Sequence, residues 1–474
     1  MTTKPDQPRA EQAPDDIEIS LYQTSKKIYA RSVKGLFNSW RWALVWITQI
    51  VFYGLPWLVW NHRQAVLFDL ESRRFYLFGL VLYPQDFIYL TGLLVIAALA
   101  LFLFTAVAGR LWCGFACPQT VYTEIFMWIE KQVEGDRSAR MRLDDGPLSG
   151  AKLGRKALKH LIWVLFGLWT GFTFVGYFTP ITLLASEVVS WTLGPWETFW
   201  ILFYGFATYG NAGWMREQVC KYMCPYARFQ SAMFDRDTMI VTYDEARGEP
   251  RGARKKSADP AALNLGSCID CTLCVQVCPT GIDIRKGLQY ECIGCGACVD
   301  ACDDVMDKMN YPRGLIKFAT ENGMANRWSR EQMVQRALRP RVLIYTGVLL
   351  AICVAVAVSL FMRTPLKVDV IRDRGAIARM VEQGRIENVF RLQAMNATEV
   401  VQKLEVSVQG LPGLVIASEH QVEVQPTEVR SLVLRLQIPP GSTASGSHPI
   451  RFQIRSLNDS GIDIREDSVF LVPR

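Results

Sequence analysis

The chain has 474 residues, half of them hydrophobic, and carries a formal net charge of +7. Its mean hydropathy of +0.12 is high for a wholly soluble protein and low for one that lies entirely in lipid. We therefore expect membrane-spanning helices together with soluble domains. The basic residues lie in blocks beside apolar runs, which is typical of membrane topology and speaks against nucleic-acid binding.

A polar arm at residues 1–35 precedes five apolar stretches, each about 20 residues long and able to cross a bilayer as a helix. The arm lacks a short apolar core, so it predicts a disordered or loosely attached segment and no secretory signal. The expected spans are 40–60, 86–108, 159–178, 190–212 and 341–362. The predicted fold class is a multi-domain membrane protein with an α-helical transmembrane part.

Lysine and arginine residues set the expected orientation of these spans. They are frequent in the arm and in 109–158 but absent from 179–190, and positively charged connections stay in the cytoplasm. Five crossings then place 213–340 in the cytoplasm and 363–474 in the periplasm. The expected location is the inner membrane of a bacterium.

The tail after the last span has a different pattern. Apolar and polar residues alternate with a period of two at 404–409, 432–438 and 450–455, and Gly, Pro, Asn and Ser separate the runs. This pattern predicts a small β-sandwich. We thus expect a polar arm at 1–35, a four-span membrane domain at 36–235, an α+β ferredoxin-like insert at 236–335, a fifth transmembrane helix at 336–364 and a β-sandwich at 365–474.

Twelve of the 13 cysteines fall in short clusters, and eight of these lie in the insert. The first run, Cys268, Cys271, Cys274 and Cys278, has the spacing C-x2-C-x2-C-x3-C-P. The second run is Cys292, Cys295, Cys298 and Cys302. This is the spacing of bacterial ferredoxins with two 4Fe–4S clusters, in which the fourth Cys of a run binds the other cluster.

Two 4Fe–4S clusters are therefore the expected cofactors. The predicted ligands of the first cluster are Cys268, Cys271, Cys274 and Cys302. The predicted ligands of the second cluster are Cys292, Cys295, Cys298 and Cys278. A zinc site also uses C-x2-C pairs, but two complete four-Cys runs in tandem are more specific for iron–sulfur clusters. Asp303 replaces the proline expected after Cys302, so the sequence does not predict the conformation of the turn there.

Two further cysteine pairs share the spacing C-x3-C-P: Cys113 and Cys117 before Pro118, and Cys220 and Cys224 before Pro225. A spacing of four on a helix puts both thiols of a pair on one face. Each pair follows an apolar hairpin, so we interpret the membrane part as a duplicated two-helix unit with both pairs at the cytoplasmic surface. Four thiols could hold one soft metal such as Cu(I), zinc or iron–sulfur, shuttle between dithiol and disulfide, or be inert.

Other redox cofactors lack their usual residues. The four histidines are His62, His160, His420 and His448, of which two border spans and two lie in the tail. Pairs of histidines within the bilayer, which would hold a haem, are therefore not expected. No G-x-G-x-x-G or G-x4-G-K-[ST] phosphate loop stands out, so NAD(P)H and ATP binding have no support.

In its order of motifs the chain resembles the CcoG family, also called FixG or RdxA, accessory proteins of cbb3-type cytochrome c oxidase. The resemblance rests on both C-x3-C-P pairs, the eight-cysteine run, the fifth span and the β-rich tail. It implies an immunoglobulin-like tail domain and an oxidoreductase that reduces Cu(II) to Cu(I) for the copper centre of the oxidase. The thiols of Cys113, Cys117, Cys220 and Cys224 would then act on copper, and oxidase-assembly or copper-delivery proteins would be partners.

Two alternatives remain open at this point. The membrane half is also similar to NapH-type ferredoxins, which implies a quinol-linked electron donor to a partner reductase. A non-enzymatic assembly scaffold is the other alternative. The sequence identifies neither the electron donor nor the cluster potentials, and it leaves a homodimer open.

Overall fold

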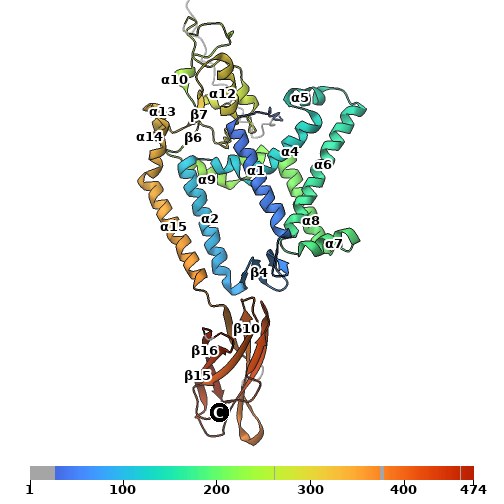
Figure 1. The fold of residues 1–474 in the computed structure, drawn as a ribbon, viewed down its shortest axis with the longest axis vertical. Helices are drawn as coiled ribbons and strands as arrows, with labels where there is room; N and C mark the ends of the chain where they lie inside the picture. The colour runs from blue at the N-terminus through green and yellow to red at the C-terminus, as the bar shows by residue number, and fades with distance from the viewer. Residues whose placement is uncertain (1–26, 261, 374–377, 460, 474) are drawn as a thin grey trace, which may run out of the picture.

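The computed structural model describes residues 27–260, 262–373, 378–459 and 461–473. The chain forms an elongated molecule with a cysteine-rich α+β part at one end and a β-sandwich at the other. Helices connect the two ends, and α2 and α15 run side by side between them (Figure 1). The soluble parts expected from the sequence thus lie at opposite ends of the helical part.

Five helices follow the predicted apolar stretches: α1 (Leu36–Gly54), α2 (Phe87–Ala108), α6 (Gly150–Val175), α8 (Pro195–Thr208) and α15 (Pro340–Phe361). Among the described residues, three helices are long and apolar enough to cross a membrane, at 84–108, 150–175 and 340–361. The helix α8 has only 14 residues, and α1 carries Asn38, Arg41 and Gln49. The described residues therefore contain three candidate spans, and the predicted count of five is not confirmed.

Proline and left-handed residues explain where two predicted spans differ from the helices. The first predicted span reaches residue 60, but α1 ends at Gly54 because Pro56 opens a short 3-10 turn, and Val59–Trp60 is a strand. The fourth predicted span begins at 190, where Trp191 ends α7 in the left-handed region and Pro195 starts α8.

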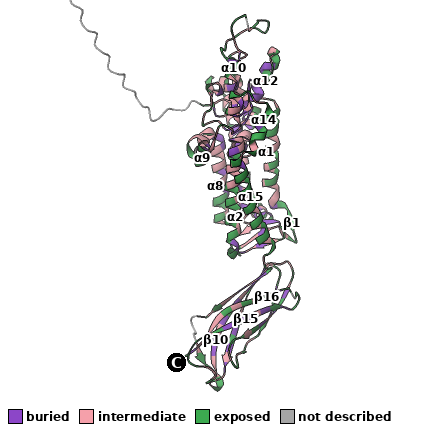
Figure 2. Ribbon diagram, turned by 90° about the vertical axis from the view of Figure 1, so that its left-hand side faces the viewer, coloured by how far each residue is buried: buried purple, intermediate pink, exposed green. Residues whose placement is uncertain are grey.

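Apolar side chains cover the outer faces of the candidate spans. Exposed residues follow α2 and α15 in Figure 2, and these include Ile88, Leu94, Ile344 and Leu350. Contacts between helices use small residues instead: a Cβ atom on Gly167 would lie 2.7 Å from the carbonyl oxygen of Gly205. Close approach of α6 and α8 through small residues is common among helices packed in a bilayer.

Shorter helices connect these segments near the cysteine-rich end. They are α3 (Leu111–Phe115), α4 (Pro118–Glu134), α5 (Arg137–Asp145), α7 (Ile181–Ser190), α9 (Pro225–Met233) and the π-helices η3 (Tyr209–Met215) and η4 (Val219–Met223). Proline occupies the first turn of α4 and α9, where its missing N–H costs nothing. Only α7 of these helices lies away from the cysteine-rich end, at the other end of α6 (Figure 1).

A small β region after α1, not expected from the sequence, contacts the β-sandwich. It consists of two antiparallel sheets. One pairs β1 (Val59–Trp60) with β2 (Arg63–Gln64), and the other has the order β3 (Val66–Asp69), β4 (Arg74–Leu77) and β5 (Leu80–Leu82). The Tyr83 hydroxyl donates to the carbonyl oxygen of Asn396 at 2.8 Å, and Arg63 pairs with Glu399 at 2.9 Å. These contacts attach the sandwich to the helical part.

The tail forms the predicted β-sandwich. One sheet has the order β12-β14-β10-β8, with β9 also paired to β10, and the facing sheet has the order β13-β11-β15-β16. The longer strands are β8 (Leu366–Arg372), β10 (Ile386–Asn396), β11 (Gln402–Gln409), β14 (Val429–Ile438), β15 (Gly446–Ser456) and β16 (Asp463–Val472), and the short ones are β9 (Arg379–Met380), β12 (Val415–Ile416) and β13 (Gln421–Val424). Phe390 and Phe452 meet between the sheets at 5.2 Å. The predicted alternation is observed, since Leu404 and Val406 are buried and Ser407 is exposed.

The cysteine-rich part is built on a short sheet and one longer helix. Strand β6 (Ile240–Tyr243) pairs antiparallel with β7 (Ile316–Ala319), and α12 (Ala297–Met309) packs against β7. Smaller helices complete it: α10 (Glu245–Gly248), α11 (Leu273–Gln276), α13 (Glu321–Ala325) and α14 (Arg330–Gln335). The Asp300 carboxylate on α12 accepts from the backbone N–H groups of Phe37 and Asn38, at 3.2 and 2.8 Å. This N-terminal cap joins α1 to the cysteine-rich part.

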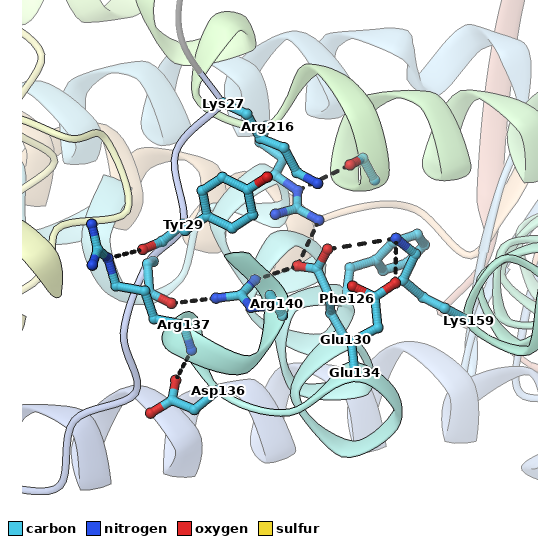
Figure 3. A network of polar contacts seen from close by, with 12 residues as sticks. Lys27, Tyr29, Phe126, Glu130, Glu134, Asp136, Arg137, Arg140, Lys159 and Arg216 are labelled. Carbon is cyan, nitrogen blue, oxygen red and sulfur yellow. Dashed lines mark hydrogen bonds and ion pairs between the residues drawn. The ribbon is translucent and has the colours of Figure 1, made fainter. Parts of the chain in front are cut away.

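The described end of the N-terminal arm is firmly attached, contrary to the expectation of a loose segment. The Arg31 N–H donates to the carbonyl oxygen of Gln276 at 2.8 Å, and the Ser32 hydroxyl donates to Asp136 at 3.0 Å. Figure 3 shows Arg137 donating to the Tyr29 carbonyl. These backbone partners could not be read from composition. Residues 1–26 of the predicted arm lie outside the described residues.

Candidate metal centres

Two cavities in the cysteine-rich part are lined by the cysteines of the two tandem runs. One small cavity is lined by Cys268, Cys271, Cys274 and Cys302. The other small cavity is lined by Cys278, Cys292, Cys295 and Cys298, and Cys274 also reaches its wall. We call them the first and the second cavity. Each brings together the four cysteines that the sequence predicts for one cluster.

Local backbone conformation explains how short loops can bend around these cavities. Gly294 and Gly296 have φ angles of 66° and 73°, in the left-handed region that favours glycine. Cys302 lies inside α12, which continues past Asp303 to Met309. A proline after Cys302 would break this helix, whereas the Asp303 carboxylate accepts from the Gly314 N–H at 2.9 Å. The missing proline is therefore explained by the helix.

The donors that line both cavities fit iron–sulfur clusters. Within the part of the chain that the structure describes, no three His, Cys, Asp or Glu side chains are arranged to hold one metal ion. A 4Fe–4S cluster takes four cysteines spread over its irons, which matches thiols around the walls of a cavity. Burial raises the pKa of Cys292 and Cys302 to about 12, so binding of metal must displace their protons.

The two C-x3-C-P pairs have the same local structure, which differs from the expected helix face. Cys113 lies in α3, but Cys117 has extended φ and ψ angles and Pro118 starts α4. Likewise, Cys220 lies in the π-helix η4, and the extended Cys224 precedes α9. Proline disfavours the helical conformation of the residue before it. Each helix therefore ends between its two thiols, and the expectation that both lie on one helical face is wrong.

The thiols of the two pairs nevertheless share one region. Cys113 and Cys220 lie close enough for their charges to interact, and so do Cys117 and Cys224. Burial raises the pKa of Cys113 to about 12 and that of Cys220 to about 11, and neighbouring thiols add to the effect. The Cys113 thiol donates to the Gln230 side-chain oxygen at 3.4 Å. All four thiols are half-buried, and those of Cys113 and Cys220 stay protonated at neutral pH until a metal displaces the proton.

The first C-x3-C-P motif packs directly on the loop of the second cavity. A Cβ atom on Gly114 would lie 2.8 Å from the carbonyl oxygen of Ile293 and 2.8 Å from the Cα atom of Cys295. Cys113 packs in one apolar cluster with Ile293 and Cys295. Gly114 was not among the predicted site residues, although its place between two thiols was a signal. The second cavity is thus the one next to the C-x3-C-P thiols.

Three family models match the chain, two of them for iron–sulfur proteins. A 4Fe-4S dicluster domain covers residues 215–321, and a 4Fe-4S binding domain covers residues 90–134, which include the first C-x3-C-P motif. The model described as an IG-like fold at the C-terminus of FixG covers residues 356–473. RdxB of Cereibacter sphaeroides is 39% identical over 471 residues, which are 97% of this chain and 98% of RdxB. The chain belongs to the FixG/RdxA family.

Other similar proteins include a second full-length relative, a shorter ferredoxin-type protein and one solved structure. FixG of Rhizobium meliloti is 37% identical over 90% of this chain and 88% of its own length. NapH of Haemophilus influenzae, a ferredoxin-type protein, is 24% identical over 46% of this chain and 69% of its own. A crystal structure of a FixG-related protein from Vibrio parahaemolyticus aligns at 28% identity with 23% of this chain and 97% of its own, with a TM-score of 0.21. The resemblance seen in the sequence is confirmed, and the protein is an iron–sulfur electron-transfer protein.

A buried ion network holds the two C-x3-C-P motifs of this FixG/RdxA protein in place. Figure 3 shows the Glu130 carboxylate of α4 between Arg140, Arg216 and Lys159, at 2.6, 3.0 and 3.6 Å. Glu134 pairs with Lys159 at 3.0 Å. Arg216 ends η3 just before the second motif, and α4 begins just after the first. The network therefore links α4 to η3, the segments next to the two motifs. No local sequence pattern shows it, because its members extend from Glu130 to Arg216.

Proposed function

We propose that this protein reduces Cu(II) to Cu(I) for the copper centre of cbb3-type cytochrome c oxidase. In this proposal the cysteines of the first and second cavities hold two 4Fe–4S clusters, with ligands as predicted from the sequence. When bound, such clusters supply electrons one at a time, as the Cu(II)/Cu(I) couple requires. The observation that carries the proposal is the packing of the first C-x3-C-P motif, at Gly114, on the Ile293–Cys295 loop of the second cavity.

Sulfur chemistry supports copper as the substrate of the C-x3-C-P thiols. Thiolates are soft ligands that prefer Cu(I), so binding of the product favours the reduction. Cys113 and Cys220 lie close enough for their charges to interact across the two motifs, and in this proposal thiols from both motifs bind one copper ion. Partners that deliver copper to the oxidase, or take it from this protein, would then dock near the motifs.

The path of the helices supports five crossings with the clusters in the cytoplasm and the sandwich in the periplasm. At its first residues α1 contacts Asp300 of the cysteine-rich part, and after its last residues the chain enters the small β region that contacts the sandwich. The helix α1 therefore runs in the opposite direction to α2 (Figure 1). The helix α8, continued by η3, packs antiparallel against α6 and returns the chain to the cysteine-rich end.

The test compares copper reduction in two sets of cysteine variants. Changing Cys113, Cys117, Cys220 and Cys224 to Ser should leave iron content and cluster spectra near wild type, because none of the four is a proposed cluster ligand. Reduction of Cu(II), followed with a Cu(I)-specific chelator after dithionite treatment and desalting, should fall sharply at equal cluster occupancy. Unchanged copper reduction would refute the proposed role, and loss of iron would assign these thiols to a third iron centre.

A cavity beside the second motif supports a second candidate, quinol-linked electron transfer to a partner reductase. This cavity, of about 490 Å³, is lined by Glu130, Lys159, His160, Trp163 and Trp214, among others. His160 stacks on Trp214 and bonds the Tyr209 hydroxyl at 3.0 Å. An aromatic ring with polar ends, such as a quinol head group, fits such a wall. Reduction of the clusters by added ubiquinol or menaquinol, and its loss in Trp214→Ala, would favour this candidate over copper reduction.

A further inference from the structure

Arg110 is a buried cation whose charge no carboxylate balances. Only 6% of the residue is exposed, and its Nε atom has no hydrogen-bond partner. Within the described ranges no ion pair joins it to Asp or Glu; its hydrogen bonds go to two carbonyl oxygens and one hydroxyl. An uncompensated buried charge is costly, so its retention requires an anion nearby.

Arg110 lies where three functional segments meet. It precedes α3, the helix that carries Cys113. Its guanidinium donates to the Cys292 carbonyl of the second cavity at 3.4 Å, and to the Ser231 hydroxyl on α9 at 2.7 Å. A further bond goes to the carbonyl of Ala227. Its charge interacts most strongly with the thiols of Cys113, Cys292, Cys220 and Cys224.

Two cations near the other cysteines, Arg285 and Arg41, are balanced by carboxylates, whereas the half-buried Arg254 donates to the Cys268 carbonyl at 3.3 Å and to the Tyr311 hydroxyl at 3.0 Å. Arg285 lines the first cavity, but it pairs with Asp270 at 2.5 Å and with Asp283 at 2.8 Å. Arg41 lies near Cys295 and pairs with Glu124 at 2.5 Å. The walls of the second cavity contain no charged side chain among the residues that line it. Arg110 therefore adds a net positive charge to the surroundings of the second cavity and of the C-x3-C-P thiols.

We propose that Arg110 is a counter-cation shared by the second cluster and the C-x3-C-P thiols. Its charge favours the reduced state of the cluster and the Cu(I) state of copper at the thiols. This inference rests on the proposed function, because it assumes iron–sulfur ligation in the second cavity and copper at the thiols. Net charge around a cluster is one determinant of its reduction potential. A nearby cation stabilises the state with one more electron, which raises the potential. The same charge repels Cu(II) more than Cu(I), so it also favours the singly charged copper ion.

The test removes or neutralises the charge and measures potentials, not copper turnover. In Arg110→Gln, titration with dithionite followed by electron paramagnetic resonance should show a lower midpoint potential for the second cluster and no change for the first. We expect a fall of at least about 59 mV, a tenfold change in the equilibrium constant of a one-electron couple. Arg110→Lys keeps the charge and should retain most of the wild-type potential.

A second pair of variants leaves Arg110 in place and covers the case in which Arg110→Gln loses its clusters. Ser231→Asp puts a carboxylate beside the guanidinium and should lower the same potential, whereas Ser231→Asn keeps the shape without the charge and should not. As a control, Arg285→Gln should lower the potential of the first cluster only. Equal potentials in Ser231→Asp and Ser231→Asn would overturn the role of Arg110. Because dithionite supplies the electrons, this result is independent of whether copper is the substrate.

Discussion

A Cβ atom placed on Gly114 would lie 2.8 Å from the Cα atom of Cys295, closer than side chains approach a backbone in practice. Glycine is therefore required where the first C-x3-C-P motif meets the second cavity. Gly114→Ala should force the two segments apart and destabilise the protein by about 1–3 kcal/mol, as overpacking does. Copper reduction should fall at equal iron content. Gly154→Ala on α6, where nothing lies within 4 Å, should retain activity and stability.

The cysteine sets around the two cavities predict the effect of removing a single ligand. Cys271 is the exposed member of the first cavity, so Cys271→Ser disturbs packing least. Anaerobically purified wild type should contain about eight irons per chain, and the variant about half, with a smaller bleach near 400 nm on reduction, as expected for two 4Fe–4S clusters. Stoichiometric zinc without visible absorbance in the wild type would contradict iron–sulfur ligation.

The five proposed crossings predict opposite sides for the two ends of the molecule. A reporter that is active only in the periplasm should be active after Arg474 and silent near Leu265. A third fusion after Ser72, in the turn between β3 and β4, tests whether α1 is a span. It should be active if α1 crosses the membrane together with α2. Silence at Ser72 with activity at Arg474 would remove α1 from the set of spans.

Burial of the C-x3-C-P thiols predicts a pH dependence of copper binding. Cys113 and Cys220 have pKa values raised to about 12 and about 11, mainly by desolvation, so Cu(I) must displace protons at neutral pH. The affinity for Cu(I), measured by competition with a chelator of known pH behaviour, should rise between pH 6 and pH 8. An affinity independent of pH would show that protonated thiols are not the copper ligands.

The same burial predicts a pH dependence of stability in the metal-free protein. The folded state holds these protons more tightly than the unfolded chain, whose thiols titrate near pH 8.5. The free energy of unfolding should therefore fall as the pH rises from about 8.5 toward 11 and 12.

The buried network around Glu130 predicts that its loss separates the motifs. Only 1% of the Glu130 side chain is exposed, and Glu130→Gln removes the counter-charge of both Arg140 and Arg216. Breaking a buried pair in this way typically costs about 3–5 kcal/mol. The thermal midpoint of the protein in detergent should fall accordingly. Asp304→Asn removes one member of the exposed pair with Lys308 and should leave the midpoint nearly unchanged.

Local patterns in the sequence were sufficient for much of this protein. The two tandem runs from Cys268 to Cys302 indicated iron–sulfur clusters because ligand spacing is a property of adjacent residues. Alternation at residues 404–409 gave the sandwich strands because successive side chains of a strand point to opposite faces. Mean hydropathy located the apolar helices, but their ends depended on Pro56, Trp191 and Pro195, whose effects act on single turns.

Only the tertiary structure decided how the C-x3-C-P pairs lie relative to the second cavity and what surrounds both. Gly114 meets Cys295 across 181 positions of the chain by their numbering, and Arg110 meets Cys292 across 182. Such contacts depend on the packing of whole elements, and no periodicity in the sequence records them. The same holds for the proximity of the Cys113 and Cys220 thiols. The sequence by itself determined the spacing of the cysteine runs and the presence of the apolar helices. Folding determined that the second cavity, the C-x3-C-P thiols and Arg110 share one site, because charge and burial act through space.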